Sequence, residues 1–241
     1  MKKLLRAGVA VFLAALIAAT SAAPAAAATS APLAPAGAAQ AAAHPSSFYY
    51  VAGKWPAGQS VSYGLHAGFP GDSNWSGRVY DAKQGWNNVA GASEPKFYWV
   101  LADYQFYGYY NQPCTLLSGY YSAIVFHQVL DSLGSNVIGY SQSCNSGGTR
   151  IAQTVAFDSS GTFWYIGTGA TTSGWMDLWS AAAHEWGHAT GFQNHLADGE
   201  AGVCPAWENV VRNTMCPAVF PGLYPMRDPN THDIHTFTAA Y

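Results

Sequence analysis

Charged side chains are scarce in this sequence, in which 10 Lys or Arg and 13 Asp or Glu residues occur among 241. No run of basic residues is present, and the formal net charge is −3. Proteins that bind nucleic acids neutralise phosphates with clustered Lys and Arg side chains. The composition therefore argues against a nucleic acid as partner.

Long apolar runs are missing from most of the chain. Residues 7–19 are an unbroken apolar stretch that follows three basic residues and precedes small ones, which is typical of a secretory signal peptide. No later window supplies the roughly 20 apolar residues that a membrane-spanning helix needs. We therefore predict a signal peptide at residues 1–28, no membrane span, and a secreted, extracellular protein.

A second segment, residues 29–47, lacks bulky side chains and consists almost entirely of Ala, Pro, Ser, Thr and Gly. Such a stretch buries too little to offset the entropy lost on ordering. We predict a disordered tether there, either a plain linker or the remnant of a pro-segment. From residue 48 onward Trp, Tyr and Phe are scattered throughout. Residues 48–241 are numerous enough for one domain with a full core, which we expect to be monomeric.

Cysteine is limited to four residues, Cys114, Cys144, Cys204 and Cys216. An even number in an exported chain indicates two disulfides. A Cys₄ zinc site would need close C-x₂-C pairs, and none occurs. Three pairings are open, and we favour Cys114–Cys144 with Cys204–Cys216 because each closes a local loop.

Periodicity and turn residues predict an α+β fold, with one twisted, mostly β sheet backed by helices. Strands are expected at residues 48–51, 60–65, 96–101, 121–129, 137–140 and 150–157. Helices are expected at residues 78–90, 177–190 and 231–240, with a loop at residues 68–77. Asp177 is the expected N-cap of the second helix, and Gly191 follows its last turn.

The second helix carries a constellation typical of a metal site. His184 and His188 stand four residues apart, so both project from one face and can reach a single Zn²⁺. Glu185 lies beside them, where a general base could take a proton from water. The alternative is a solvent-facing helix with two unrelated histidines. Trp179 and Trp186 argue against it, because they place the histidines next to buried surface.

Two histidines leave a zinc site incomplete, so a third ligand must follow in the chain. Gly191 ends the helix and permits the sharp turn that would bring such a ligand back. The segment 184–195, HEWGHATGFQNH, resembles the metzincin metalloproteases, whose pattern is H-E-x-x-H-x-x-G-x-x-H followed by a Met-turn. The matching residues are His184, Glu185, His188 and Gly191.

The last histidine of that pattern departs by one position. The resemblance would place the third ligand at Asn194, whereas the imidazole belongs to His195. A carboxamide is a weak zinc ligand and a neutral imidazole a good one. We predict His195 as the third ligand, reached through a one-residue bulge, with Asn194 and Asp198 as the alternatives.

The resemblance covers nearly all of residues 50–241 and is dense only around the zinc motif and at the C-terminus. The segment with Met215 looks like the Met-turn whose methionine lies beneath the metal; the alternative is a core methionine beside a disulfide. Residues 232–241 resemble the closing helix of the matrixins, in which an aspartate, here Asp233, supports that turn. Astacin-like and serralysin-like members carry a tyrosine where this chain has Pro217, so no tyrosinate ligand is expected.

Animal matrixins also bind a second, structural zinc and calcium in the loop before the zinc helix. The corresponding loop of this sequence offers few ligands for either ion. Residues 145–176 contain no histidine and a single carboxylate, Asp158, which makes a second, structural zinc improbable. Calcium has no positive sign in the sequence, although backbone carbonyls can bind it. One catalytic Zn²⁺ is therefore the expected cofactor.

These features predict a zinc endopeptidase that acts on proteins or peptides, with Glu185 as the catalytic base. The substrate would lie along an exposed sheet edge, for which residues 150–157 are the candidate by analogy, and residues 215–224 would form a pocket wall. The rival hypothesis is a metzincin-like zinc domain that binds a partner without cutting it, using aromatic residues within 98–121. Glu185 favours catalysis, because a pure binding module has no need of a carboxylate beside the metal.

Overall fold

The computed structural model describes residues 53–99, 108–116, 122–134, 137–160, 162–171, 174–192, 214–215 and 226–241. All of these belong to one compact unit, Gly37–Tyr241. The predicted signal peptide (1–28), tether (29–47) and first strand (48–51) lie outside the described residues. So do His195, Cys204, Cys216 and Pro217.

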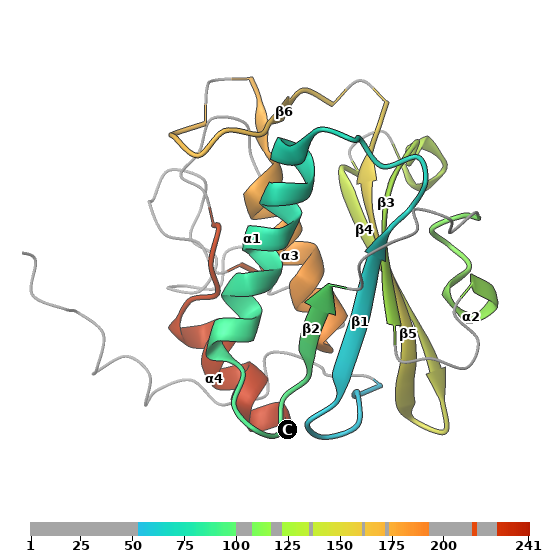
Figure 1. The fold of residues 1–241 in the computed structure, drawn as a ribbon, viewed down its shortest axis with the longest axis vertical. Helices are drawn as coiled ribbons and strands as arrows, with labels where there is room; N and C mark the ends of the chain where they lie inside the picture. Colours follow the sequence, from blue (N-terminus) through green and yellow to red (C-terminus); the bar gives the residue numbers. More distant parts are fainter. Residues whose placement is uncertain are drawn as a thin grey trace, which may run out of the picture. The chain divides into compact units, whose positions relative to one another are not determined.

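Five strands form the main sheet, in the order β2-β1-β3-β5-β4 (Figure 1). They are β1 (Ser60–Leu65), β2 (Lys96–Trp99), β3 (Ser122–Gln128), β4 (Gly139–Ser146) and β5 (Thr149–Asp158). All neighbouring strands are parallel except β4, which runs antiparallel to β5. A separate parallel pair consists of β6 (Trp164–Tyr165) and β7 (Met176–Asp177).

The sheet order corrects one expectation. Residues 150–157, the predicted edge strand, form part of β5, which is hydrogen-bonded to β3 on one side and β4 on the other. β4 is the edge strand instead. The cause is the two-residue turn at Gly147 and Gly148, whose φ values of 57° and 80° favour a tight hairpin and fold β4 onto the outside of β5.

Four α-helices complete the described fold, together with one 3₁₀ turn at Asp131–Leu133. α1 (Ser73–Val89), α3 (Leu178–Thr190) and α4 (Thr231–Ala240) lie on one side of the sheet, whereas the short α2 (Pro113–Leu116) lies on the other (Figure 1). The predicted α+β class is therefore confirmed. No described helix has the length and apolarity needed to cross a membrane.

Two elements extend further than their sequence patterns indicated. α1 begins at Ser73 and not at residue 78, because the Asp72 side chain accepts a hydrogen bond from the Asn74 amide and caps the first turn. β4 continues to Ser146, past the predicted end at residue 140. Its polar residues hid it, since pairing with β5 uses backbone groups whatever the side chains are.

A large apolar core fills the space between the helices and the sheet. Its fully buried members include Trp55, Trp86, Trp186, Phe97 and Phe237. A smaller cluster with Tyr110, Ile124 and Phe126 lies elsewhere in the fold and includes Cys144. The disulfide Cys114–Cys144 joins α2 to β4, as predicted.

Candidate metal centre

The ends of α3 are set by two residues that the sequence singled out. The Asp177 carboxylate accepts hydrogen bonds from the amide and hydroxyl of Ser180, at 2.9 and 2.6 Å, and caps the N-terminus. Gly191 ends the helix with a φ of 135°, and its amide donates to the His188 carbonyl. A side chain at that φ would be strained, so glycine permits the turn.

His184 and His188 lie one helical turn apart, with ring centroids separated by 4.9 Å. The Nδ1 atom of His184 is 2.7 Å from the Thr214 carbonyl oxygen, and that of His188 is 2.9 Å from the Phe192 carbonyl oxygen. Because a carbonyl only accepts, each Nδ1 must carry the hydrogen. A neutral ring with this tautomer has its lone pair at Nε2 and can ligate a metal through that atom.

Glu185 is buried between α3 and β4. Among the described residues, its Oε2 atom has no hydrogen-bond partner. Burial raises the pKa of Glu185 to about 8, opposed by the Ser141 hydroxyl. Gly139 makes room for this side chain, since a Cβ there would lie 2.5 Å from the Glu185 Oε1 atom.

Met215 and Asp233 are placed around the same helix. Met215 is fully buried and packs so closely against α3 that a Cβ on Gly187 would overlap its Sδ atom. Asp233, also fully buried, accepts hydrogen bonds from the amides of Thr214 and Asn230, at 2.9 and 3.0 Å. The Asp233 carboxylate on α4 therefore holds Thr214, whose carbonyl orients His184.

The last turn of α3 is capped by side chains that sequence reasoning missed. The buried Arg150 donates through Nη1 to the carbonyls of His188 and Ala189, at 2.5 and 3.0 Å. The Trp55 indole also donates to Ala189, and the Tyr241 hydroxyl donates to Thr190. Burial lowers the pKa of Arg150 to about 10, so the guanidinium stays charged near neutral pH. A cation at a helix C-terminus is favourable. No local sequence pattern predicted that Arg150 of β5 would supply it.

The N-terminal end of α3 has a second unpredicted tie. The Arg227 guanidinium pairs with the Asp177 carboxylate, at 2.9 and 3.1 Å, and donates to the carbonyls of Thr168 and Gly169. This links the helix start to the segment before α4 and to the loop after β6. Both ends of the helix that carries the two histidines are thus held by buried or half-buried arginines.

The residues present fit two positions of a zinc site. Two neutral imidazoles, with tautomers set by backbone carbonyls, are suitable nitrogen donors, and a buried carboxyl group lies beside them. Within the described ranges, no group of three His, Cys, Asp or Glu residues could hold a metal ion. The predicted third ligand, His195, and its alternatives Asn194 and Asp198 lie outside those ranges.

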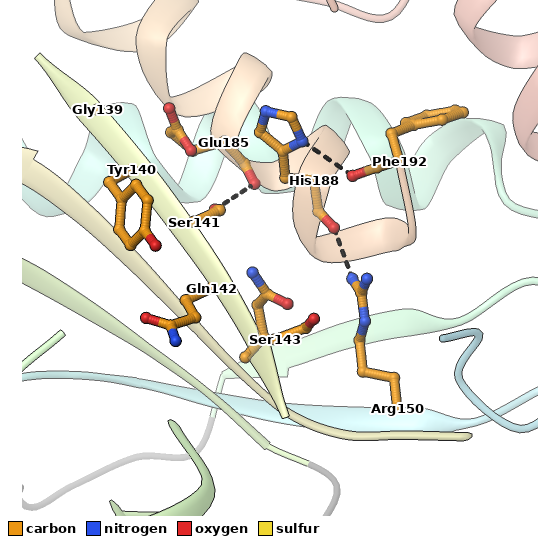
Figure 2. Close-up of a pocket in the computed structure, with 10 residues that line it drawn as sticks. Gly139, Tyr140, Ser141, Gln142, Ser143, Arg150, Glu185, His188 and Phe192 are labelled. Carbon is orange, nitrogen blue, oxygen red and sulfur yellow. Dashed lines mark hydrogen bonds between the residues drawn. The ribbon is translucent and has the colours of Figure 1, made fainter. Parts of the chain in front are cut away.

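A cavity of about 350 Å³ opens between α3 and β4 (Figure 2). Glu185 and His188 contribute to its wall from the helix. Small and polar residues contribute from the sheet. The full lining consists of Gly139, Tyr140, Ser141, Gln142, Ser143, Arg150, Gln153, Glu185, His188 and Phe192.

Comparisons with protein-family models and with curated proteins found no match for this chain.

Proposed function

We propose that this chain is a secreted zinc-dependent endopeptidase of the metzincin type. The observation that carries the proposal is the pairing of His184 and His188 on one face of α3, each with Nδ1 directed to a backbone carbonyl, beside the buried Glu185. Nothing in a purely structural helix calls for two oriented imidazoles together with a buried carboxyl group whose Oε2 atom has no partner among the described residues.

His184 and His188 would hold Zn²⁺ through Nε2, with His195 as the third ligand. When bound, the ion would polarise a peptide carbonyl and make water a better acid. Met215 packs beneath the helix at Gly187, where its thioether fills space without competing strongly for zinc. Asp233 keeps the adjacent Thr214 in place.

Glu185 would act as the general base and then as the general acid. It takes a proton from the attacking water and passes it to the leaving amine. Its burial and the lack of a hydrogen bond to Oε2 from any described residue support this role, because a carboxylate with few competing hydrogen bonds is a stronger base. Its place on the cavity wall, next to His188, gives it access to a bound peptide (Figure 2).

The substrate would bind in an extended conformation along β4. This strand is the edge of the sheet nearest to α3, and one side of its backbone faces away from β5. An added peptide strand gains main-chain hydrogen bonds there whatever its sequence. The same edge borders the cavity that contains Glu185, so a peptide on β4 would pass the candidate metal centre.

A partner-binding role without cleavage is the second candidate. Tyr98 and Tyr109, in the aromatic-rich region, are 51% and 65% exposed and could form part of a recognition surface. The position of Glu185 favours catalysis over this alternative.

Metal analysis and peptide cleavage on the purified chain test the proposal. We expect one zinc per chain and cleavage of casein or a peptide library that a chelator abolishes. Glu185→Ala should keep zinc and lose turnover, whereas His195→Ala should weaken zinc binding. His235→Ala, at an exposed histidine of α4, is the matched control and should change neither property. Zinc binding without any cleavage would favour the partner-binding role, and hydrolysis by zinc-loaded Glu185→Ala would refute the assigned base.

A further inference from the structure

The cavity beside Glu185 owes its existence to small residues on β4. Alternate residues of a strand face the same side, and the helix-facing positions here are Gly139, Ser141 and Ser143. The Ser141 hydroxyl donates to the Glu185 backbone carbonyl at 3.1 Å, which confirms that this face of the strand meets α3 (Figure 2). A row of larger side chains at these positions would fill the space.

The wall opposite the helix is polar. Gln153, on β5, is 1% exposed and lines the cavity. Its amide nitrogen donates to the Thr154 carbonyl at 3.2 Å, but its Oε1 atom has no hydrogen-bond partner among the described residues. A buried acceptor without a donor is unfavourable, because the hydrogen bond that it lost with water is not replaced. Such a group in a cavity wall indicates that an occupant supplies the missing hydrogen bond.

The groups around the cavity disfavour an ionised occupant. A substrate cation would meet the guanidinium of Arg150, which is held in the wall by the His188 and Ala189 carbonyls, and like charges at short range in a buried site oppose each other strongly. A substrate carboxylate has no hydrogen to donate, so it would leave the Oε1 atom of Gln153 unpaired.

An apolar occupant is disfavoured for a different reason. It would fill the space beside the Oε1 atom of Gln153 without supplying the hydrogen bond that this atom needs. An uncharged side chain with both a donor and an acceptor avoids each of these costs. Serine and threonine have this combination on a short side chain and tyrosine and histidine have it on a rigid ring, whereas glutamine and asparagine have it on a slender, flexible side chain that suits a recess.

We infer that this cavity, which we call the amide recess, binds the glutamine or asparagine side chain of a substrate residue next to the cleaved bond. The inference rests on the proposed peptidase function, because Glu185 and His188 line the same space. Gln153 is the specificity-determining residue, and its Oε1 accepts from the substrate amide. Ser143 lies on the same wall and adds a second hydrogen-bonding group.

Peptides that differ at one residue test the recess. Glutamine is compared with methionine, glutamate and lysine at each position flanking the cleaved bond, on the zinc-loaded full chain. We expect kcat/KM to favour glutamine over methionine by roughly 10- to 100-fold. Gln153→Met should reduce that ratio to less than about threefold while the methionine peptide is still cut. Gln59→Met, the same change at a residue outside the cavity, should keep the wild-type ratio.

Two further measurements separate the recess from the peptidase function. If Gln153→Met fails to fold, the milder change Ser143→Ala takes its place. It should reduce the preference for the glutamine peptide over the methionine peptide. Calorimetric titration of the same peptides into metal-free protein reports selection without turnover. Tighter binding of the glutamine peptide without any cleavage would support the recess and contradict the peptidase. Cleavage without an amide preference, or with a preference that survives Gln153→Met, would overturn the recess alone. Absence of both binding and cleavage would overturn both.

Discussion

The Nδ1 atom of His184 lies 2.7 Å from the carbonyl oxygen of Thr214, 30 residues further along the chain. The Thr214 amide in turn donates to Asp233 on α4. Hydrogen bonds on either side of the Thr214 backbone therefore connect a buried carboxylate to a candidate metal ligand. Hydrogen bonds of this kind hold the ring of a ligand and its tautomer.

Asp233→Asn tests this path. The amide keeps the shape but is a weaker acceptor than the carboxylate for the Thr214 and Asn230 amides. We expect the free energy of unfolding to fall by about 1–3 kcal/mol and zinc affinity to fall roughly 10-fold. Urea unfolding and competition with a zinc-binding dye measure the two effects. Asp81→Asn, which removes an ion pair with Arg78 on the helix surface, should cost less than about 1 kcal/mol and leave zinc affinity unchanged.

Gly187→Ala tests the close packing of Met215. A Cβ at Gly187 would overlap the Met215 Sδ atom and lie 2.9 Å from the Trp86 ring. We expect a net loss of about 1–3 kcal/mol, because overpacking outweighs the better helix propensity of alanine. Gly77→Ala, in α1, has no atom within 4 Å of the new Cβ and should stabilise the protein by about 0.5–1 kcal/mol. Thermal unfolding of the two variants measures both changes in stability. If Gly187→Ala stabilised the protein as Gly77→Ala does, the close packing of Met215 against Gly187 would be contradicted.

Lys83 predicts a pH dependence of stability. Its side chain is 3% exposed, and burial lowers its pKa from 10.5 to about 8. Between these values the unfolded chain binds more protons than the folded one, so stability rises with pH through this window. We expect a gain of about 2 kcal/mol between pH 8 and 9.5. Lys83→Met should remove the gain and Lys96→Met should retain it, as measured by urea unfolding at each pH. A slope of the same size in Lys83→Met would rule out this lysine as its source.

Removal of the disulfide should lower stability without disturbing the candidate metal centre. Cys114 and Cys144 are 30 residues apart, and closing a loop of that length stabilises by about 3–4 kcal/mol. Replacing both by serine should lower the free energy of unfolding by that amount. Zinc content should stay at one per chain, because Cys144 packs with Tyr110 and Phe126. The described members of this cluster include no residue of α3. Loss of zinc in a folded double variant would contradict this separation.

Local patterns predicted α3 and α4 well. α3 spans Leu178–Thr190 with Asp177 and Gly191 as its caps, and α4 spans Thr231–Ala240. Caps and 3.6-residue periodicity are properties of neighbouring residues, so they can be read without the fold. The start of α1 was missed because residues 73–77 carry turn-forming side chains, whose preference the Asp72 cap and the packing of Trp75 override.

The sequence by itself determined that His184, Glu185 and His188 share one helix, because a four-residue spacing places two side chains on one face wherever the helix lies. Only the tertiary structure decided which carbonyls set the two tautomers, that Arg150 caps the helix end, and that β4 rather than β5 is the edge beside the cavity. Except for the contact of His188 with Phe192, which spans four residues and needs the turn at Gly191, these depend on contacts between residues 30 or more positions apart or on the order of strands. Pairing of strands uses backbone groups that every residue shares, so no local pattern specifies which neighbours meet.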